Sequence, residues 1–173
     1  TIFASRKPGP VNKTFGRLQI ISSAWFALTH GANDGQKTMG IIVLILFSAG
    51  LIPDLEMPLW VIFAAATAMG LGTFFGGYKV IKTLGVKITK LKPYQGFAAE
   101  TSGGLMLAVF AVFGIPASTT HAITGTIMGS GAARRKRAVR WKVSRQIVFS
   151  WIITIPGAAG LGIGFTYLIN LFV

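Results

Sequence analysis

The chain contains no cysteine and only four acidic residues, against 17 lysines and arginines. The absence of cysteine excludes disulfide bonds, thiol catalysis and cysteine-ligated metal sites. Charged residues of both signs make up only 12% of the sequence, whereas hydrophobic residues make up 52%. Because an ordinary soluble domain carries about 25% charged residues, this composition predicts a membrane protein.

The start of the chain lacks the features of a signal peptide. Its first residues, TIFASRKPGPVNKTFGR, are basic but contain no apolar core followed by a small-residue cleavage site. We expect residues 1–17 to be a basic cytoplasmic linker and residues 18–173 to be the transmembrane part. Since the chain begins without Met, in a segment that contains Pro and Gly, we expect it to be a fragment of a longer protein.

The positive charge is concentrated in three clusters. All but one of the 17 lysines and arginines lie within residues 6–17, 79–92 and 134–145. Long stretches without positive charge separate the clusters, which is the pattern of cytoplasmic loops between membrane segments. A net charge of +13 would otherwise suggest a nucleic-acid binder, but this distribution favours the membrane interpretation. The exception is Lys37.

Placing all three clusters in the cytoplasm predicts the order of the crossings. Residues 18–50 lead outward, the loop that carries Asp54 and Glu56 lies outside, and residues 59–77 return. Residues 146–172 cross outward at the end of the chain. The protein is therefore expected to be all-α and to cross the membrane several times.

Residues 94–133 have cytoplasmic charge on both flanks, so they must enter and leave from the same side. We expect a helical hairpin, in which Pro116 ends one helix and Ser118, Thr119 and Thr120 can cap the next. So polar a turn fits a protein-lined cavity better than lipid. This favours a re-entrant hairpin over a spanning one.

The first membrane segment is too long for one straight crossing. As a single helix, residues 18–50 would measure about 50 Å, against a hydrocarbon core of about 30 Å. The sequence GAND lies in its middle, where Gly31 tolerates unusual backbone angles and Asn33 and Asp34 compete for backbone hydrogen bonds. We therefore predict a discontinuous helix, as found in many secondary transporters.

Two acidic residues outside the external loop are candidates for function. Asp34 in a membrane helix costs about 2.5–3.5 kcal/mol on insertion scales, so it needs a partner such as Lys37 or a functional role. Glu100 lies near the start of the predicted hairpin, and an interfacial position remains an alternative for it. Either carboxylate could hold a coupling cation or a transferable proton.

The histidines and the hydroxyl cluster do not indicate an enzyme. His30 and His121 lie on separate elements, which is a poor metal signature, and a structural role is favoured for both. Ser118 lacks the glycine elbow of a hydrolase. The helix that begins at Ser118 instead presents free N–H groups and a positive dipole end, which together form an anion site. A carboxylate beside a bound anion is repulsive unless it is neutralised, which supplies a physical basis for symport.

Three stretches resemble the C-terminal repeat of the inorganic phosphate transporter (PiT) family. They are HGANDGQKTMG, GFAAETSGG and GIPASTTHAITGTIMGSG, in this order and spacing, and the resemblance covers residues 18–172. It implies a secondary transporter built from two inverted repeats, with alternating access around a midplane site. The GQK that follows GAND is similar to bacterial members described as proton- or metal-phosphate symporters, which favours protons over sodium.

The resemblance also implies roles for individual residues. Those expected to bind phosphate are Asn33, Asp34, Ser118, Thr119 and Thr120. Those expected to handle the coupling ion are Asp34 and Glu100, and the supporting residues are Gln36, Lys37 and His121. No cofactor or resident metal is expected, although phosphate travelling with a divalent metal is left open.

Only one GAND motif and one STTH motif occur in the chain. The other repeat must therefore come from the same longer protein, from another chain or from a second copy. The expected function is phosphate symport across a cell membrane, the inner membrane of a bacterium being favoured, and a homodimer remains open. The alternatives are a transporter of another oxyanion such as sulfate, a non-transporting receptor or subunit on the same scaffold and, third, a soluble nucleic-acid binder.

Overall fold

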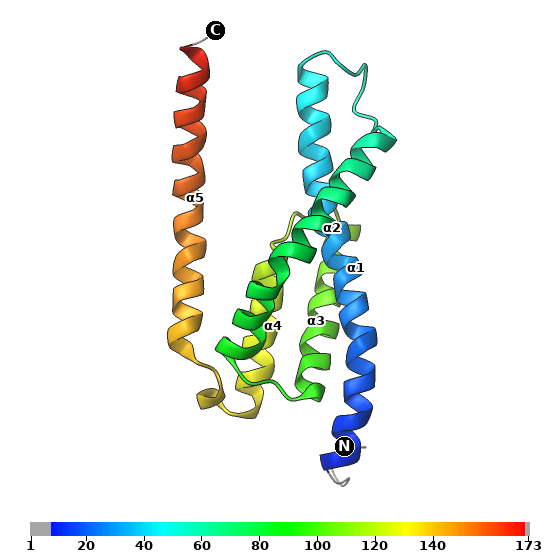
Figure 1. The fold of residues 1–173 in the computed structure, drawn as a ribbon, viewed down its shortest axis with the longest axis vertical. Helices are drawn as coiled ribbons and strands as arrows, with labels where there is room; N and C mark the ends of the chain where they lie inside the picture. The colour runs from blue at the N-terminus through cyan, green and yellow to red at the C-terminus, as the bar shows by residue number, and fades with distance from the viewer. Residues whose placement is uncertain (1–7, 172–173) are drawn as a thin grey trace. The chain divides into compact units, whose positions relative to one another are not determined.

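The computed structural model describes residues 8–171, and over these residues the fold is all-helical, as predicted. The elements in chain order are α1 (Pro8–Ser48), α2 (Leu59–Lys82), the π-helix η1 (Thr83–Ile88), α3 (Pro93–Val112), α4 (Thr119–Arg134), the 3-10 helix η2 (Lys136–Ala138) and α5 (Trp141–Asn170) (Figure 1). The chain divides into two compact units, residues 1–139 and residues 140–173. Up to residue 171, the second unit consists of α5.

The predicted break in the first helix is wrong, because α1 continues through Gly31, Asn33 and Asp34 without interruption. Residues from Pro8 onward, which were expected to belong to a linker, form its first turns. The carboxylate of Asp34 does not compete for backbone groups, since it is held by side chains of α1 and α4. A helix of 41 residues is about 61 Å long, so in a bilayer it must tilt or extend past the hydrocarbon core.

Helices α1 and α3 end in the same way, at a glycine in the left-handed region. Gly50 has φ 69° and Gly114 has φ 65°. The N–H of Gly50 donates to the carbonyl of Phe47 and the N–H of Leu51 to that of Leu46, at 3.0 and 2.9 Å. The same two bonds recur after α3, so both ends are Schellman motifs, which require a residue that tolerates positive φ.

The predicted hairpin is formed by α3 and α4, and its connection carries the predicted helix cap. Ser118 is the N-cap of α4, and its hydroxyl oxygen accepts a hydrogen bond from the N–H of His121 at 3.3 Å. The predicted end of the first hairpin helix at Pro116 is wrong, because α3 ends at Val112 and the chain turns at Gly114. The cap at Ser118 depends on neighbouring residues only, which explains why the sequence indicated it correctly.

The hairpin packs against α1, and α1 and α3 run in parallel (Figure 1). The Phe15 ring lies edge-on to that of Phe97, with centroids 5.5 Å apart, and further along both helices Trp25 lies against Gly104. A Cβ atom at Gly104 would lie 2.6 Å from Cδ1 of Trp25, closer than side chains tolerate. Small residues of this kind allow membrane helices to approach closely.

The two ends of the helix group in the first unit differ in charge, one being basic and the other acidic. The start of α1, the end of α2, the start of α3 and the end of α4 lie together, and these are the basic segments (Figure 1). The loop with the exposed residues Asp54 and Glu56 lies at the other end. The hairpin therefore begins and ends on the same side, as the charge pattern predicts.

Within residues 8–171, two helical segments are long and apolar enough to cross a membrane, Leu59–Ile88 and Trp141–Asn170. The hairpin reaches only part of the way along α1, because its tip residue Ala117 contacts Lys37. Lys37 lies about 16 Å before the end of α1 at Ser48. The turn between α3 and α4 thus lies beside the interior of α1 and not beside its end.

Replacing Gly104 by Val is expected to destabilise the contact between α1 and α3. The new side chain would overlap Trp25, and overpacking of this kind costs about 1–3 kcal/mol of unfolding free energy. Unfolding by denaturing detergent in mixed micelles measures the effect. Gly125→Val on α4 is the matched control, because a Cβ atom at Gly125 meets nothing within 4 Å. Equal losses in the two variants would contradict close packing at Gly104.

Candidate functional site

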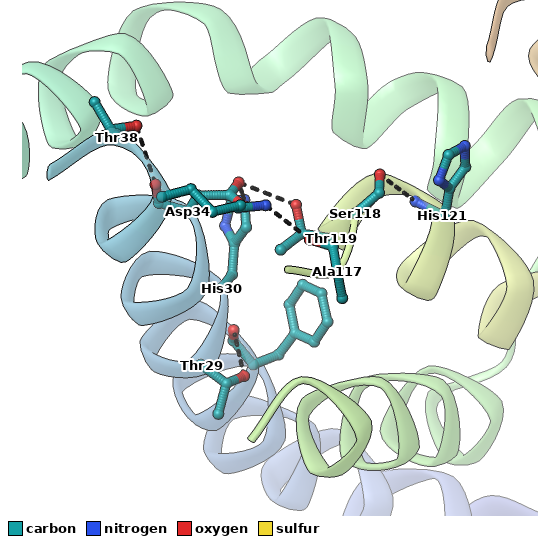
Figure 2. A network of polar contacts seen from close by, with 10 residues as sticks. Thr29, His30, Asp34, Thr38, Ala117, Ser118, Thr119 and His121 are labelled. Atoms are coloured by element: carbon teal, nitrogen blue, oxygen red, sulfur yellow. Dashed lines mark hydrogen bonds and ion pairs between the residues drawn. The ribbon is translucent and has the colours of Figure 1, made fainter. Parts of the chain in front are cut away.

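The carboxylate of Asp34 is the centre of a polar network that joins α1 to the hairpin (Figure 2). Its Oδ2 atom accepts a hydrogen bond from Thr119 Oγ1 at 3.0 Å and lies 3.1 Å from His30 Nε2. Its Oδ1 atom lies 2.9 Å from Lys37 Nζ. His30 and Lys37 are four residues before and three residues after Asp34, the spacing that places side chains on one helix face. The contact with Lys37 is the partner that the sequence offered as the alternative to a functional role for Asp34.

Lys37 makes a second contact, to the main chain of the hairpin. Its Nζ donates to the carbonyl oxygen of Ala117 at 2.7 Å (Figure 2). With the bond from Thr119 to Asp34, this gives two polar contacts between α1 and the tip of the hairpin. The side chains of Lys37 and Asp34 are 35% and 26% exposed, so the pair is partly open to its surroundings.

A cavity of about 880 Å³ lies between α1, α2 and the hairpin tip. The wall formed by α2 is made of small or apolar side chains. The polar groups of the cavity therefore come from α1 and from the hairpin tip. The polar residues are Asp34, Lys37, Thr38, Ser118, Thr119 and Thr120. The first turn of α4 also contributes N–H groups that have no partner within the helix, so cationic, hydroxyl and amide donors share this cavity.

A second cavity, of about 860 Å³, contains Glu100 and His30 in its lining. Glu100 is held by two side chains of α1, Ser22 Oγ at 2.6 Å and Gln19 Nε2 at 3.4 Å from its carboxylate oxygens. The residues that line both cavities are Met69, Thr119 and Thr120. The two spaces therefore adjoin at the hairpin tip.

Five of the predicted site residues line the first cavity: Asp34, Lys37, Ser118, Thr119 and Thr120. The other four lie elsewhere. Asn33 is buried, at 3% exposure, and its Oδ1 atom has no hydrogen-bond partner among the described residues. Gln36 and His121 are exposed and line neither cavity, while Glu100 belongs to the second one. The roles expected for these four residues stay predictions.

Two contacts of the site were not predicted from the sequence, that of His30 with Asp34 and that of Ser22 with Glu100. The His30 ring also stacks on Phe26, with centroids 6.1 Å apart. A signal was available, because Ser22, Phe26, His30 and Asp34 follow one another at intervals of four and so share one face of α1. The bond between Ser22 and Glu100 joins residues 78 positions apart, which no local pattern indicates.

An all-helical chain with membrane-length helices and a charged, hydroxyl-lined cavity at a helical hairpin has the character of a membrane transporter. Residues 3–162 match the phosphate transporter family. The chain belongs to this family, as the resemblance of its motifs predicted. The family is one of transporters and not of enzymes.

The chain is also similar to individual proteins. It is 50% identical over 159 residues to a "Probable low-affinity inorganic phosphate transporter" of Rhizobium meliloti (strain 1021), covering 91% of this chain and 48% of that protein. It is 42% identical over 171 residues to a protein of the same description from Bacillus subtilis (strain 168), covering 98% of this chain and 51% of that protein. The chain thus spans about half the length of these curated relatives.

A solved structure described as "The sodium-dependent phosphate transporter" has the same fold. The TM-score is 0.75 at 33% sequence identity, over 89% of this chain and 40% of that one. The likeness agrees with an all-helical transporter fold, and it covers again less than half of the other protein.

Replacing Ser22 by Ala is expected to destabilise the protein by about 1.5–3 kcal/mol, because a buried hydroxyl that bonds a carboxylate is lost. The neighbouring Ser23 is the matched control. It is exposed and bonds only the carbonyl of Ile20 within its own helix, so Ser23→Ala should have little effect. Unfolding of both variants in mixed micelles measures the difference. Similar free energies would show that the Ser22–Glu100 bond contributes little.

Proposed function

We propose that this chain forms one half of a secondary transporter that carries inorganic phosphate across a membrane. The observation that carries the proposal is the first cavity, where Lys37, the hydroxyls of the hairpin tip and the start of α4 come together. Membership of the phosphate transporter family and the descriptions of the relatives support the substrate. We place the protein in a cell membrane as a multi-pass protein, with the bacterial inner membrane as its expected location.

Phosphate would be held by donors that are still available in the cavity. Lys37 has three N–H donors, and its contacts with Asp34 and Ala117 use two of them. The Ser118 oxygen accepts from the backbone, which leaves its O–H as a donor, and the Thr120 hydroxyl has no partner among the described residues. Together with the amide groups at the start of α4, these donors suit a tetrahedral oxyanion.

Asp34 would repel a bound anion if its charge were not balanced. Lys37 provides that balance, and His30 and Thr119 also contact the carboxylate. Glu100 lies in the adjoining cavity, and it is the second candidate for binding a coupling cation, a proton or sodium. A cation bound at either of the two candidates, Asp34 or Glu100, would then favour phosphate binding, which is the thermodynamic requirement of symport.

The two adjoining cavities support alternating access around the hairpin tip. They meet at Met69, Thr119 and Thr120, so a substrate at the tip could be reached from either space. The tip lies beside the interior of α1, which supports a re-entrant hairpin. A second repeat, in the same longer protein or another chain, would complete the site and cover apolar side chains of α2 that are exposed here, such as Phe74 and Phe75.

Uptake of radiolabelled phosphate into proteoliposomes tests the proposal, using protein that contains this chain and its partner half. We expect uptake under an imposed proton gradient or an imposed sodium gradient, and the active gradient identifies the coupling ion. Competition by sulfate and dependence on magnesium separate phosphate from other oxyanions and from a metal-phosphate complex. Absence of uptake under both gradients, with folded protein in the vesicles, would overturn the proposal.

Replacing Thr120 by Val should weaken phosphate binding about ten- to a hundredfold, because one hydrogen bond to an anion is lost without a change of shape. The matched control is Thr126→Val on the same helix, since Thr126 bonds the carbonyl of Ile123 and lines neither cavity. Equilibrium binding of labelled phosphate to purified protein measures both variants. An unchanged affinity in Thr120→Val would remove this hydroxyl from the site.

A further inference from the structure

The ammonium group of Lys37 lies between two oxygen atoms from different elements. One is Oδ1 of Asp34 on α1, at 2.9 Å, and the other is the main-chain carbonyl oxygen of Ala117 at the hairpin tip, at 2.7 Å. Carboxylate and carbonyl oxygens are the ligands that hard cations take. Secondary transporters hold sodium ions with such groups at interrupted helix ends. Lys37 thus stands where a bound cation would be expected.

The remaining oxygen of Asp34 is also engaged. Thr119 donates to Oδ2, and His30 Nε2 lies 3.1 Å from the same atom. A lysine ammonium is a compact point charge, comparable in charge and hydration to a monovalent cation. A second cation would have to approach Asp34 beside this charge and would be repelled by it. The charge of the carboxylate is therefore balanced by Lys37, a group that belongs to the protein.

We propose that Lys37 is a built-in substitute for a coupling cation at Asp34, and that it is the residue that excludes sodium from this half of the site. The inference rests on the proposed function only where it concerns phosphate. Under it, Asp34 does not bind the coupling ion, and that role falls to Glu100 in the adjoining cavity or to the partner half. Removing the ammonium would expose Oδ1 of Asp34 and the carbonyl of Ala117 together, which creates a sodium site.

The test compares four variants in protein that contains both halves. Lys37→Met removes the charge and keeps the length of the side chain, whereas Lys37→Arg keeps the charge. Lys90→Met is the matched control, because Lys90 is exposed at the basic end and lines neither cavity. The double variant with Asp34→Asn and Lys37→Met lacks both charges. Size-exclusion chromatography in detergent verifies that each variant is folded and monodisperse.

The first measurement is binding of radioactive sodium in the absence of phosphate. We expect Lys37→Met to bind one more sodium ion per chain than the wild type, and Lys37→Arg and Lys90→Met to bind no more. The extra ion should disappear in the double variant, because its carboxylate ligand is absent. If folded Lys37→Met gains no sodium ion, the inference is overturned, whatever happens to phosphate binding.

The second measurement is phosphate binding in sodium chloride and in choline chloride at equal ionic strength. In Lys37→Met, sodium should raise the phosphate affinity about tenfold relative to choline, a coupling of ordinary size. In Lys90→Met the ratio should equal that of the wild type. A Lys37→Met ratio equal to that of the wild type would count against the inference. A wild type that binds no phosphate, beside a Lys37→Met that gains sodium, would overturn the proposed function and leave the inference standing.

A third measurement does not depend on the folding of Lys37→Met. Because Lys37 keeps sodium away from Asp34, Asp34→Asn alone should leave the sodium binding of the protein unchanged. Loss of a sodium ion in Asp34→Asn would show that this carboxylate is a sodium ligand in the native protein, and it would overturn the inference.

Discussion

The charge on Asp34 is the constraint on which the rest of the site depends. A carboxylate at the centre of a membrane helix costs about 2.5–3.5 kcal/mol on insertion scales, unless its charge is balanced by neighbours. Here two of the neighbours, His30 and Lys37, come from α1 itself, and the third, Thr119, comes from the hairpin. Because Lys37 also bonds Ala117, two of these neighbours, Lys37 and Thr119, hold the hairpin tip against α1.

This constraint explains why α1 is continuous where its sequence suggests a break. Asp34 and Asn33 disrupt helices when their side chains bond nearby backbone groups. The side chain of Asp34 bonds other side chains. The main-chain carbonyl of Asp34 accepts a hydrogen bond from the Thr38 hydroxyl at 3.0 Å within the helix. The helix is thus stabilised by a tertiary contact that removes the competing local bond.

The features that the sequence predicted correctly are those that depend on neighbouring residues. The N-cap at Ser118 and the hairpin around it follow from side chains within a few positions. The contact of Asp34 with Lys37, which the sequence offered as an alternative to a functional role, also joins near neighbours. The bond from Thr119 to Asp34 joins residues 85 positions apart, and the setting of Glu100 depends on Ser22. Such contacts leave no periodic signal, so composition and spacing could not indicate them.

A bound phosphate and the hairpin tip would use the same hydrogen-bond donors, those of Thr119 and Lys37. Thr119 has one O–H group, which it donates to Asp34, and Lys37 has one N–H group left after its two contacts. A phosphate in the first cavity that recruited the Thr119 hydroxyl would leave Asp34 one donor short. One that drew Lys37 away from Ala117 would release the hairpin tip. Under the proposed function, the free energy of phosphate binding is therefore linked to the position of the hairpin tip. Phosphate shifts the equilibrium between a bound and a released hairpin tip only through contacts that differ between these two states.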